Sequence, residues 1–280
     1  MQIHWPLVIS TACQRVGLGM FACAFLANLA LGTVLPLNVV ALATLTLLAV
    51  GGIASIFHLQ TPARFFNAFS NFGSHLTQEA LITPFLGIAL LACGLNGFVY
   101  DMGPATIVVE TAACILAAAF LACTGLAYQM RSRPAWNTGF VLGLFLLTAA
   151  EAGSIAVCAV CVLIGAVVPT GLAVATGVLF VACVVVQCAY LARMRHVGYG
   201  VDVRVNEEPY KTVFYLWLAV GVACTGAGLA AGLAVASSEL LLAAAVASAL
   251  GIVAWTVLFF KGACKVKMFP MYPVDLNLDM

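Results

Sequence analysis

This sequence has very little charge. Only 8% of its 280 residues are Asp, Glu, Lys or Arg, whereas 64% are hydrophobic. A water-soluble domain usually has about a quarter charged residues, which cover its surface. The composition therefore excludes a soluble globular protein, and it also excludes disordered and nucleic-acid-binding chains, which depend on charged residues. So much apolar surface is stable when lipid takes the place of water around it.

Charges, prolines and glycine-rich breaks divide the chain into eight apolar runs. Each is close to the ~20 residues that a helix needs to cross a bilayer. The runs cover residues 6–31, 36–57, 79–98, 105–130, 137–162, 168–192, 212–236 and 239–260. We therefore predict an all-α polytopic transmembrane bundle of about eight helices. The transmembrane domain would cover residues 1–261 and be followed by a polar C-terminal tail at 262–280.

Lysine and arginine are missing from one side of this predicted bundle. An even number of helices places both termini and the second, fourth and sixth links on the same side. Ten of the 11 Lys and Arg residues fall there, and the eleventh, Arg15, lies inside the first run. The ten are Arg64, Arg131, Arg133, Arg193, Arg195, Arg204, Lys211, Lys261, Lys265 and Lys267. The positive-inside rule would make this basic side cytoplasmic, but docking of an acidic soluble partner is an alternative cause.

Paired metal ligands are also scarce. The 11 cysteines are scattered, and the only CxxC is Cys158-Ala159-Val160-Cys161, without the second pair that a zinc or iron–sulfur site needs. We interpret the cysteines as small buried hydrophobic residues, with a disulfide between Cys158 and Cys161 as the alternative. None of the four histidines lies in the middle of a run, so a haem b would lack its axial ligands. The sequence predicts neither a metal site nor a haem.

Three charged residues, Arg15, Glu110 and Glu151, lie inside apolar runs. A charge near the bilayer centre costs at least about 2.5–3.5 kcal/mol, so such a residue should face the bundle interior and have a partner. We predict an intramembrane polar network of these three residues, in which Arg15 could pair with Glu79 or Glu151. A structural ion pair and a route for protons or a ligand both remain open as explanations.

The segment between the second and third runs contains the best candidate site. His58 ends one predicted helix, Glu79 opens the next, and Arg64 and Asn67 lie between them. A quinone headgroup has two oxygens that accept hydrogen bonds from His, Arg or Asn. Oxidation of a quinol releases two protons, and an imidazole such as His58 is a suitable base from which Glu79 could relay a proton. We interpret His58, Arg64, Asn67 and Glu79 as quinol-binding, with His58 and Glu79 also catalytic.

Two motifs resemble a known family. The stretch His58-Leu-x-x-Pro62-x-Arg64-x-Phe66-Asn67, followed by Gly73 and Glu79, resembles the membrane anchor subunit of dimethyl sulfoxide reductases. So does Trp5-Pro6-Leu7-x-Ile9-x-Thr11 at the amino terminus. The resemblance is closest over residues 4–90 and implies a haem-free anchor that binds menaquinol through His58, Arg64, Glu79 and Asn67. It further implies a partner subunit with four iron–sulfur clusters and a molybdopterin catalytic subunit.

Taken together, these features predict the menaquinol-oxidising anchor of a molybdopterin and iron–sulfur reductase complex. It would lie in a prokaryotic cell membrane, serve anaerobic respiration, and carry the quinol site without performing the terminal reduction. The predicted quinol residues His58, Arg64 and Glu79 belong to the basic side, and electron tunnelling favours short distances. The ferredoxin-like subunit would therefore dock on the basic side. Two alternatives stay open: a polysulfide or nitrite reductase-type quinone anchor that translocates protons, and a secondary transporter lined by Arg15, Glu110 and Glu151.

Overall fold

The computed structural model describes residues 5–57, 71–131, 133, 135–196 and 208–261. The helices are α1 (Trp5–Leu31), α2 (Leu37–Ile56), α3 (His75–Leu95), α4 (Thr106–Ala127), α5 (Phe140–Leu163), α6 (Thr170–His196), α7 (Glu208–Leu216), α8 (Thr225–Val235) and α9 (Ser238–Lys261). A 3₁₀ turn, η2 (Gly103–Ala105), precedes α4, and a π-helix, η3 (Trp217–Cys224), joins α7 to α8. Eight spans in the described residues are long and apolar enough to cross a membrane, which confirms the predicted all-α bundle.

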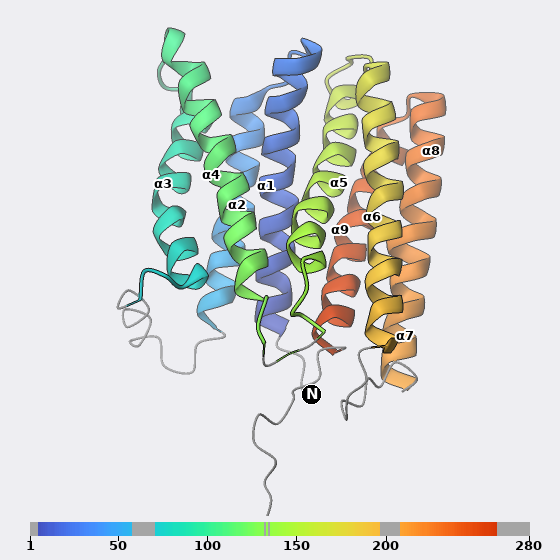
Figure 1. The fold of residues 1–280 in the computed structure, drawn as a ribbon. Coiled ribbons are helices and arrows are strands. Elements are labelled where there is room, and N and C mark those ends of the chain that lie inside the picture. Colours follow the sequence, from blue (N-terminus) through green and yellow to red (C-terminus); the bar gives the residue numbers. More distant parts are fainter. Residues whose placement is uncertain (1–4, 58–70, 132, 134, 197–207, 262–280) are drawn as a thin grey trace, which may run out of the picture.

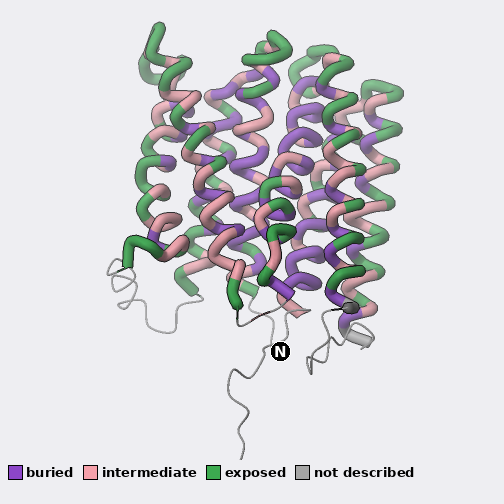
Figure 2. Tube along the Cα trace, in the orientation of Figure 1, coloured by how far each residue is buried: buried purple, intermediate pink, exposed green. Residues whose placement is uncertain are grey.

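Three helices form the centre of the bundle. Figure 1 shows α3 and α4 at one edge, α6 and α8 at the other, and α1, α5 and α9 between them. Buried residues make up 61%, 61% and 56% of the most apolar part of α1, α5 and α9, against 17–28% in the other spans. Figure 2 shows the same concentration of burial in the middle of the bundle. The outer helices therefore present apolar side chains to the surroundings, as expected for helices in lipid.

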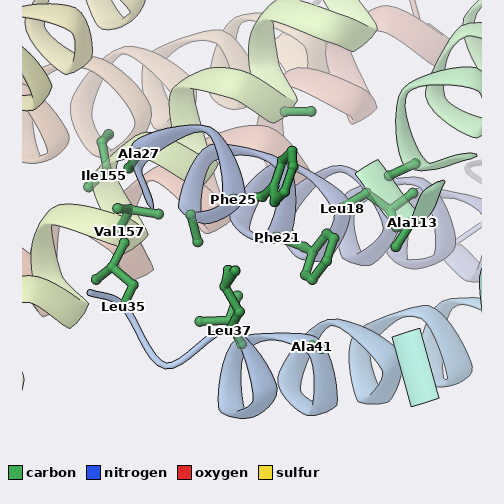
Figure 3. Packing of buried hydrophobic residues seen from close by; sticks show 14 of the residues in the cluster. Leu18, Phe21, Phe25, Ala27, Leu35, Leu37, Ala41, Ala113, Ile155 and Val157 are labelled. Carbon is green, nitrogen blue, oxygen red and sulfur yellow. The ribbon is translucent and has the colours of Figure 1, made fainter. Parts of the chain in front are cut away.

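Helices α1 and α5 cross with their backbones in direct contact. A Cβ atom on Gly19 would lie 1.9 Å from the backbone oxygen of Ala149, and one on Gly153 would lie 2.2 Å from the backbone of Gly19. Small residues of this kind allow close helix packing in membranes. Beside this crossing, large side chains of α1 such as Phe21 and Phe25 pack against α2, α4 and α5 in one continuous core (Figure 3).

Helix α3 begins earlier than the hydropathy pattern predicts. It starts at His75, where the backbone N–H of Gln78 donates to the oxygen of Ser74 at 3.0 Å. The side chains of His75 and Gln78 are also joined by a 3.0 Å hydrogen bond. Three of the four residues in the first turn are polar, so this turn gave little hydrophobic signal. Glu79 therefore lies in the second turn of α3, and the prediction that it opens the helix is wrong.

The one-sided distribution of basic residues is confirmed for the described part of the chain. The ends of α2, α4, α6 and α9 lie on the same side of the bundle as the beginning of α1 (Figure 1). We call this the basic side, because Arg131, Arg193 and Lys261 lie there. The opposite side has the exposed Asp101 and Glu239, and its links, at residues 32–36, 96–102, 164–169 and 236–237, contain no Lys or Arg.

The cysteines in the described residues are free thiols. Cys158 and Cys161 are both buried in α5, and the sulfur of Cys158 lies 3.4 Å from the hydroxyl oxygen of Thr176 in α6. This confirms the interpretation of the CxxC pair as buried small residues over the alternative of a disulfide. Cys188 and Cys224 differ from that interpretation because they are exposed on the outside of the bundle.

Candidate functional site

A cavity of about 490 Å³ lies between α2 and α3 near the basic side. Its lining is mostly apolar: Gln14, Leu48, Gly52, Ser55, Ile56, Leu76, Glu79, Ala80, Thr83, Pro84 and Phe120. Ile56 and Leu76 at its edge are 55% and 59% exposed on the outer surface of the spans. The lining residues Gly52, Thr83 and Pro84, farther inside the spans, are also exposed, so the cavity is open on the outer surface of the bundle, which faces lipid in a membrane.

The packing of α2 and α3 explains where the cavity lies. Toward the opposite side the two helices are close, since a Cβ on Gly94 would lie 2.6 Å from the side chain of Leu42. The side chain of Asn38 also donates to the backbone oxygen of Asn96 there, at 3.2 Å. Toward the basic side, α3 contains Pro84, which removes one helical hydrogen bond and favours a bend. The cavity occupies the space between the helices at that level.

Glu79 gives this cavity a carboxylate. One of its carboxyl oxygens, Oε2, accepts a hydrogen bond from the hydroxyl of Thr124 in α4, at 2.9 Å. Among the described residues, neither an arginine nor a lysine forms an ion pair with Glu79, and Oε1 has no hydrogen-bond partner. The carboxylate is thus oriented by one neighbour while its other oxygen remains able to accept a proton or a hydrogen bond.

Sequence reasoning missed Gln14, which lines the same cavity from α1. Its side chain is only 6% exposed, and its Oε1 atom is buried without a hydrogen-bond partner among the described residues. A buried acceptor left without a partner costs about 1–3 kcal/mol, which makes such atoms rare in native proteins. The signal was present in the sequence, because Gln14 is an uncharged polar residue inside an apolar run, but only charged residues were singled out.

The other residues predicted for this site lie outside the described residues. They are His58, Arg64 and Asn67, which belong to the segment between α2 and α3. The described chain stops at Phe57 on one side of this segment, directly after the cavity residue Ile56. Their interpretation as quinol ligands therefore stays a prediction.

Arg15 does not form the predicted ion pair in the described structure. Its Nε donates to the backbone oxygen of Thr11 at 3.0 Å, and its terminal nitrogens donate to the hydroxyls of Thr148 and Thr256. The guanidinium carbon also lies 4.7 Å from the centre of the Phe145 ring. Hydroxyl dipoles and an aromatic face therefore compensate the buried charge, and no described carboxylate does so.

The three residues of the predicted polar network lie in different surroundings. Both carboxyl oxygens of Glu151 lie 3.0 Å from the hydroxyl of Ser248 in α9, beside a cavity of about 10 Å³. That volume is close to the space one water molecule needs. Glu110 lines a separate cavity of about 530 Å³ toward the opposite side, together with Asn28 and Asn38. No hydrogen bond among the described residues joins Arg15, Glu110 and Glu151 to one another.

The model of one protein family, the DMSO reductase anchor subunit (DmsC), matches residues 1–205 of this sequence. The chain belongs to this family. The comparison with curated proteins found no match to this sequence. The matched residues extend well beyond 4–90, where the two motifs lie, so the resemblance predicted from those motifs is confirmed.

The protein is thus a multi-pass membrane anchor of a DMSO reductase-type complex. The family match includes α1 to α6, and so it includes all four helices that line the cavity of this anchor. Helices α7, α8 and α9 lie beyond the matched residues. The cavity with Glu79 and Gln14 therefore lies entirely in the part of the anchor that the family defines.

Proposed function

We propose that this anchor oxidises menaquinol in the cavity between α2 and α3 and passes the electrons to a docked iron–sulfur subunit. The observation that carries the proposal is the position of Glu79, a carboxylate inside a largely apolar cavity that opens toward lipid. Small-molecule sites usually have volumes of about 300–1,000 Å³ and few polar groups, and this cavity fits that description. Menaquinol is dissolved in the bilayer, so a lateral opening suits it.

The proposed chemistry removes two electrons and two protons from each quinol, which leaves as the quinone. One hydroxyl donates to the free oxygen of Glu79, while Thr124 holds the other carboxyl oxygen. His58 takes the second proton, and Arg64 and Asn67 hold the quinol oxygens. Because the cavity adjoins the basic side, both protons have a short path to water from these bases.

The two electrons pass from the quinol directly to the partner subunits, so the proposed path requires no haem in this chain. We propose that the partner on the basic side is a ferredoxin-like subunit with four iron–sulfur clusters. A molybdopterin subunit would then receive the electrons and carry out the terminal reduction. This arrangement gives the anchor its place in anaerobic respiration in a prokaryotic cell membrane. Its basic side supplies charges that complement an acidic docking surface.

The proposal is tested in the purified complex with the variants Glu79→Gln, His58→Ala and Arg64→Ala. We expect each to lower quinol-dependent reduction at least about tenfold, because each loses a proton acceptor or a hydrogen-bond donor at the quinol. Reduction driven by an artificial dye that feeds the partner subunits directly should stay unchanged. Glu110→Gln is the matched control, because Glu110 lines a different cavity, toward the opposite side. Full quinol activity in all three variants would disprove the assignment.

A further inference from the structure

We infer that Gln14 is a quinol ligand in the cavity between α2 and α3, where its side-chain amide binds a headgroup oxygen. This inference rests on the proposed function, which assigns the cavity to quinol. Gln14 is the residue of α1 that lines this cavity, and it is buried far more deeply than Leu76 and Ile56 at the opening. Its amide is therefore placed to contact a headgroup that has entered fully between the helices.

The amide oxygen Oε1 of Gln14 has no hydrogen-bond partner among the described residues. Another buried glutamine of the bundle, Gln187 in α6, shows the usual arrangement. Gln187 is 5% exposed, and its Oε1 accepts a hydrogen bond from the indole N–H of Trp217 at 3.2 Å. Buried amides are normally partnered in this way. Gln14 differs because its surroundings provide a cavity where a partner would be.

The backbone holds Gln14 at this position. Gly51 in α2 lies against α1, since a Cβ on Gly51 would be 3.1 Å from the backbone oxygen of Ser10 and 3.6 Å from the Cγ atom of Gln14. The absence of a side chain at Gly51 lets α2 approach α1 closely, and the next residue, Gly52, lines the cavity. The glutamine stem is thus packed against α2 while the amide remains at the cavity wall.

An amide also suits the change that the substrate undergoes. A quinol hydroxyl donates a hydrogen bond, which the oxygen Oε1 can accept, whereas a quinone oxygen only accepts, which the NH₂ group can satisfy. Rotation of the amide group about its last side-chain bond exchanges the two atoms. Gln14 can therefore bind the headgroup before and after oxidation, and the carboxylate of Glu79 accepts the proton.

The test compares Gln14→Leu with Gln187→Leu in the purified complex. Gln14→Leu should raise the KM for quinol about tenfold or more, without changing dye-driven reduction, because one headgroup hydrogen bond is lost. In the absence of quinol its unfolding temperature should be unchanged or higher, because leucine removes an unpartnered buried amide. The rise in unfolding temperature that added quinone gives the unaltered complex should become smaller.

The control should show the reverse pattern. Gln187→Leu should leave the quinol KM unchanged and lower the unfolding temperature, because the indole N–H of Trp217 loses its acceptor. An unchanged quinol KM in Gln14→Leu, with Glu79→Gln inactive, would overturn the role of Gln14 and leave the proposed function standing. A lower unfolding temperature for Gln14→Leu without quinol would also overturn it. Unchanged quinol kinetics in both Gln14→Leu and Glu79→Gln would overturn the proposed site itself.

Discussion

Arg15 shows how single residues hold the centre of this bundle together. The hydroxyls of Thr148 and Thr256 donate to backbone oxygens four residues earlier in their own helices, each at 2.6 Å. Their oxygen lone pairs are then available to the guanidinium of Arg15. Through these bonds one side chain of α1 joins α5 and α9. The charge is thus compensated by dipoles, and it links the three most buried helices.

Replacing Thr256 with Val should therefore lower the stability of the anchor. The hydrogen bond to a charged, buried guanidinium is lost, and such bonds contribute about 1.5–3 kcal/mol. The measurement is the unfolding midpoint of the purified complex in detergent. Thr46→Val is the matched control, because Thr46 is exposed on α2 and, among the described residues, its hydroxyl bonds only the backbone oxygen of Leu42. Equal midpoints for the two variants would contradict the role assigned to Thr256.

Replacing Glu151 with Gln should leave quinol oxidation nearly unchanged. Glu151 lies beside a water-sized cavity between α5, α6 and α9, separate from the cavity with Glu79. The amide can keep the hydrogen bond to Ser248 and carries no charge. We expect quinol-driven and dye-driven rates within about twofold of the original. A selective loss of the quinol-driven rate would instead place Glu151 on a proton route and favour a proton-translocating anchor.

The candidate site could be predicted from the sequence only in part. Glu79 was identified because a carboxylate next to His, Arg and Asn at a membrane interface is chemically conspicuous. Gln14 was not, because its importance comes from having no partner, and partners depend on how distant helices pack. The predicted pairing of Arg15 with a carboxylate was wrong for a related reason. Hydroxyl groups of Thr148 and Thr256 take that role, and isolated threonines in apolar runs give no signal of it.

At the scale of elements, the close crossing of α1 and α5 limits which substitutions of small residues the bundle tolerates. Gly153→Ala would place a Cβ 2.2 Å from the backbone of Gly19, and backbone cannot move aside as a flexible side chain can. We expect a loss of about 1–3 kcal/mol or more, seen as lower yield and a lower unfolding temperature of the complex. Gly143→Ala in the same helix meets nothing within 4 Å and should be neutral or stabilising. Similar losses in both variants would contradict the close crossing.

The elements themselves were largely predictable, because about 20 apolar residues can cross a bilayer only as a helix. The exceptions have physical causes. The first turn of α3 is mostly polar, so hydropathy placed the start of this helix too late. At the end of the π-helical segment η3, the hydroxyl of Thr225 donates to the backbone oxygen of Val220, five residues earlier, at 3.0 Å. Amino-acid composition does not predict where a helix changes from α to π geometry. The crossing of Gly19 and Gly153 joins helices far apart in the sequence.

At the scale of the whole molecule, the basic side is the expected docking surface for the iron–sulfur partner. Arg131 and Arg193 are exposed there at the ends of α4 and α6. The double variant Arg131→Glu and Arg193→Glu should lower the amount of partner that copurifies, most clearly as salt is raised, because complementary charges hold the surfaces together. Asp101→Lys on the opposite side is the control and should have no effect. If the same amount of partner copurified with both variants, docking on the basic side would be contradicted.

The central position of α1, α5 and α9 also determines when the bundle can be completed. Arg15 is made near the beginning of the chain, whereas Thr148 and Thr256 follow 133 and 241 residues later. At about 5–20 residues per second, translation needs roughly 12–48 s to reach Thr256. During this interval the guanidinium must be stabilised by water, lipid headgroups or the insertion machinery. Helix α9 therefore completes the environment of a charge in α1, so this part of the core cannot close before α9 has been synthesised.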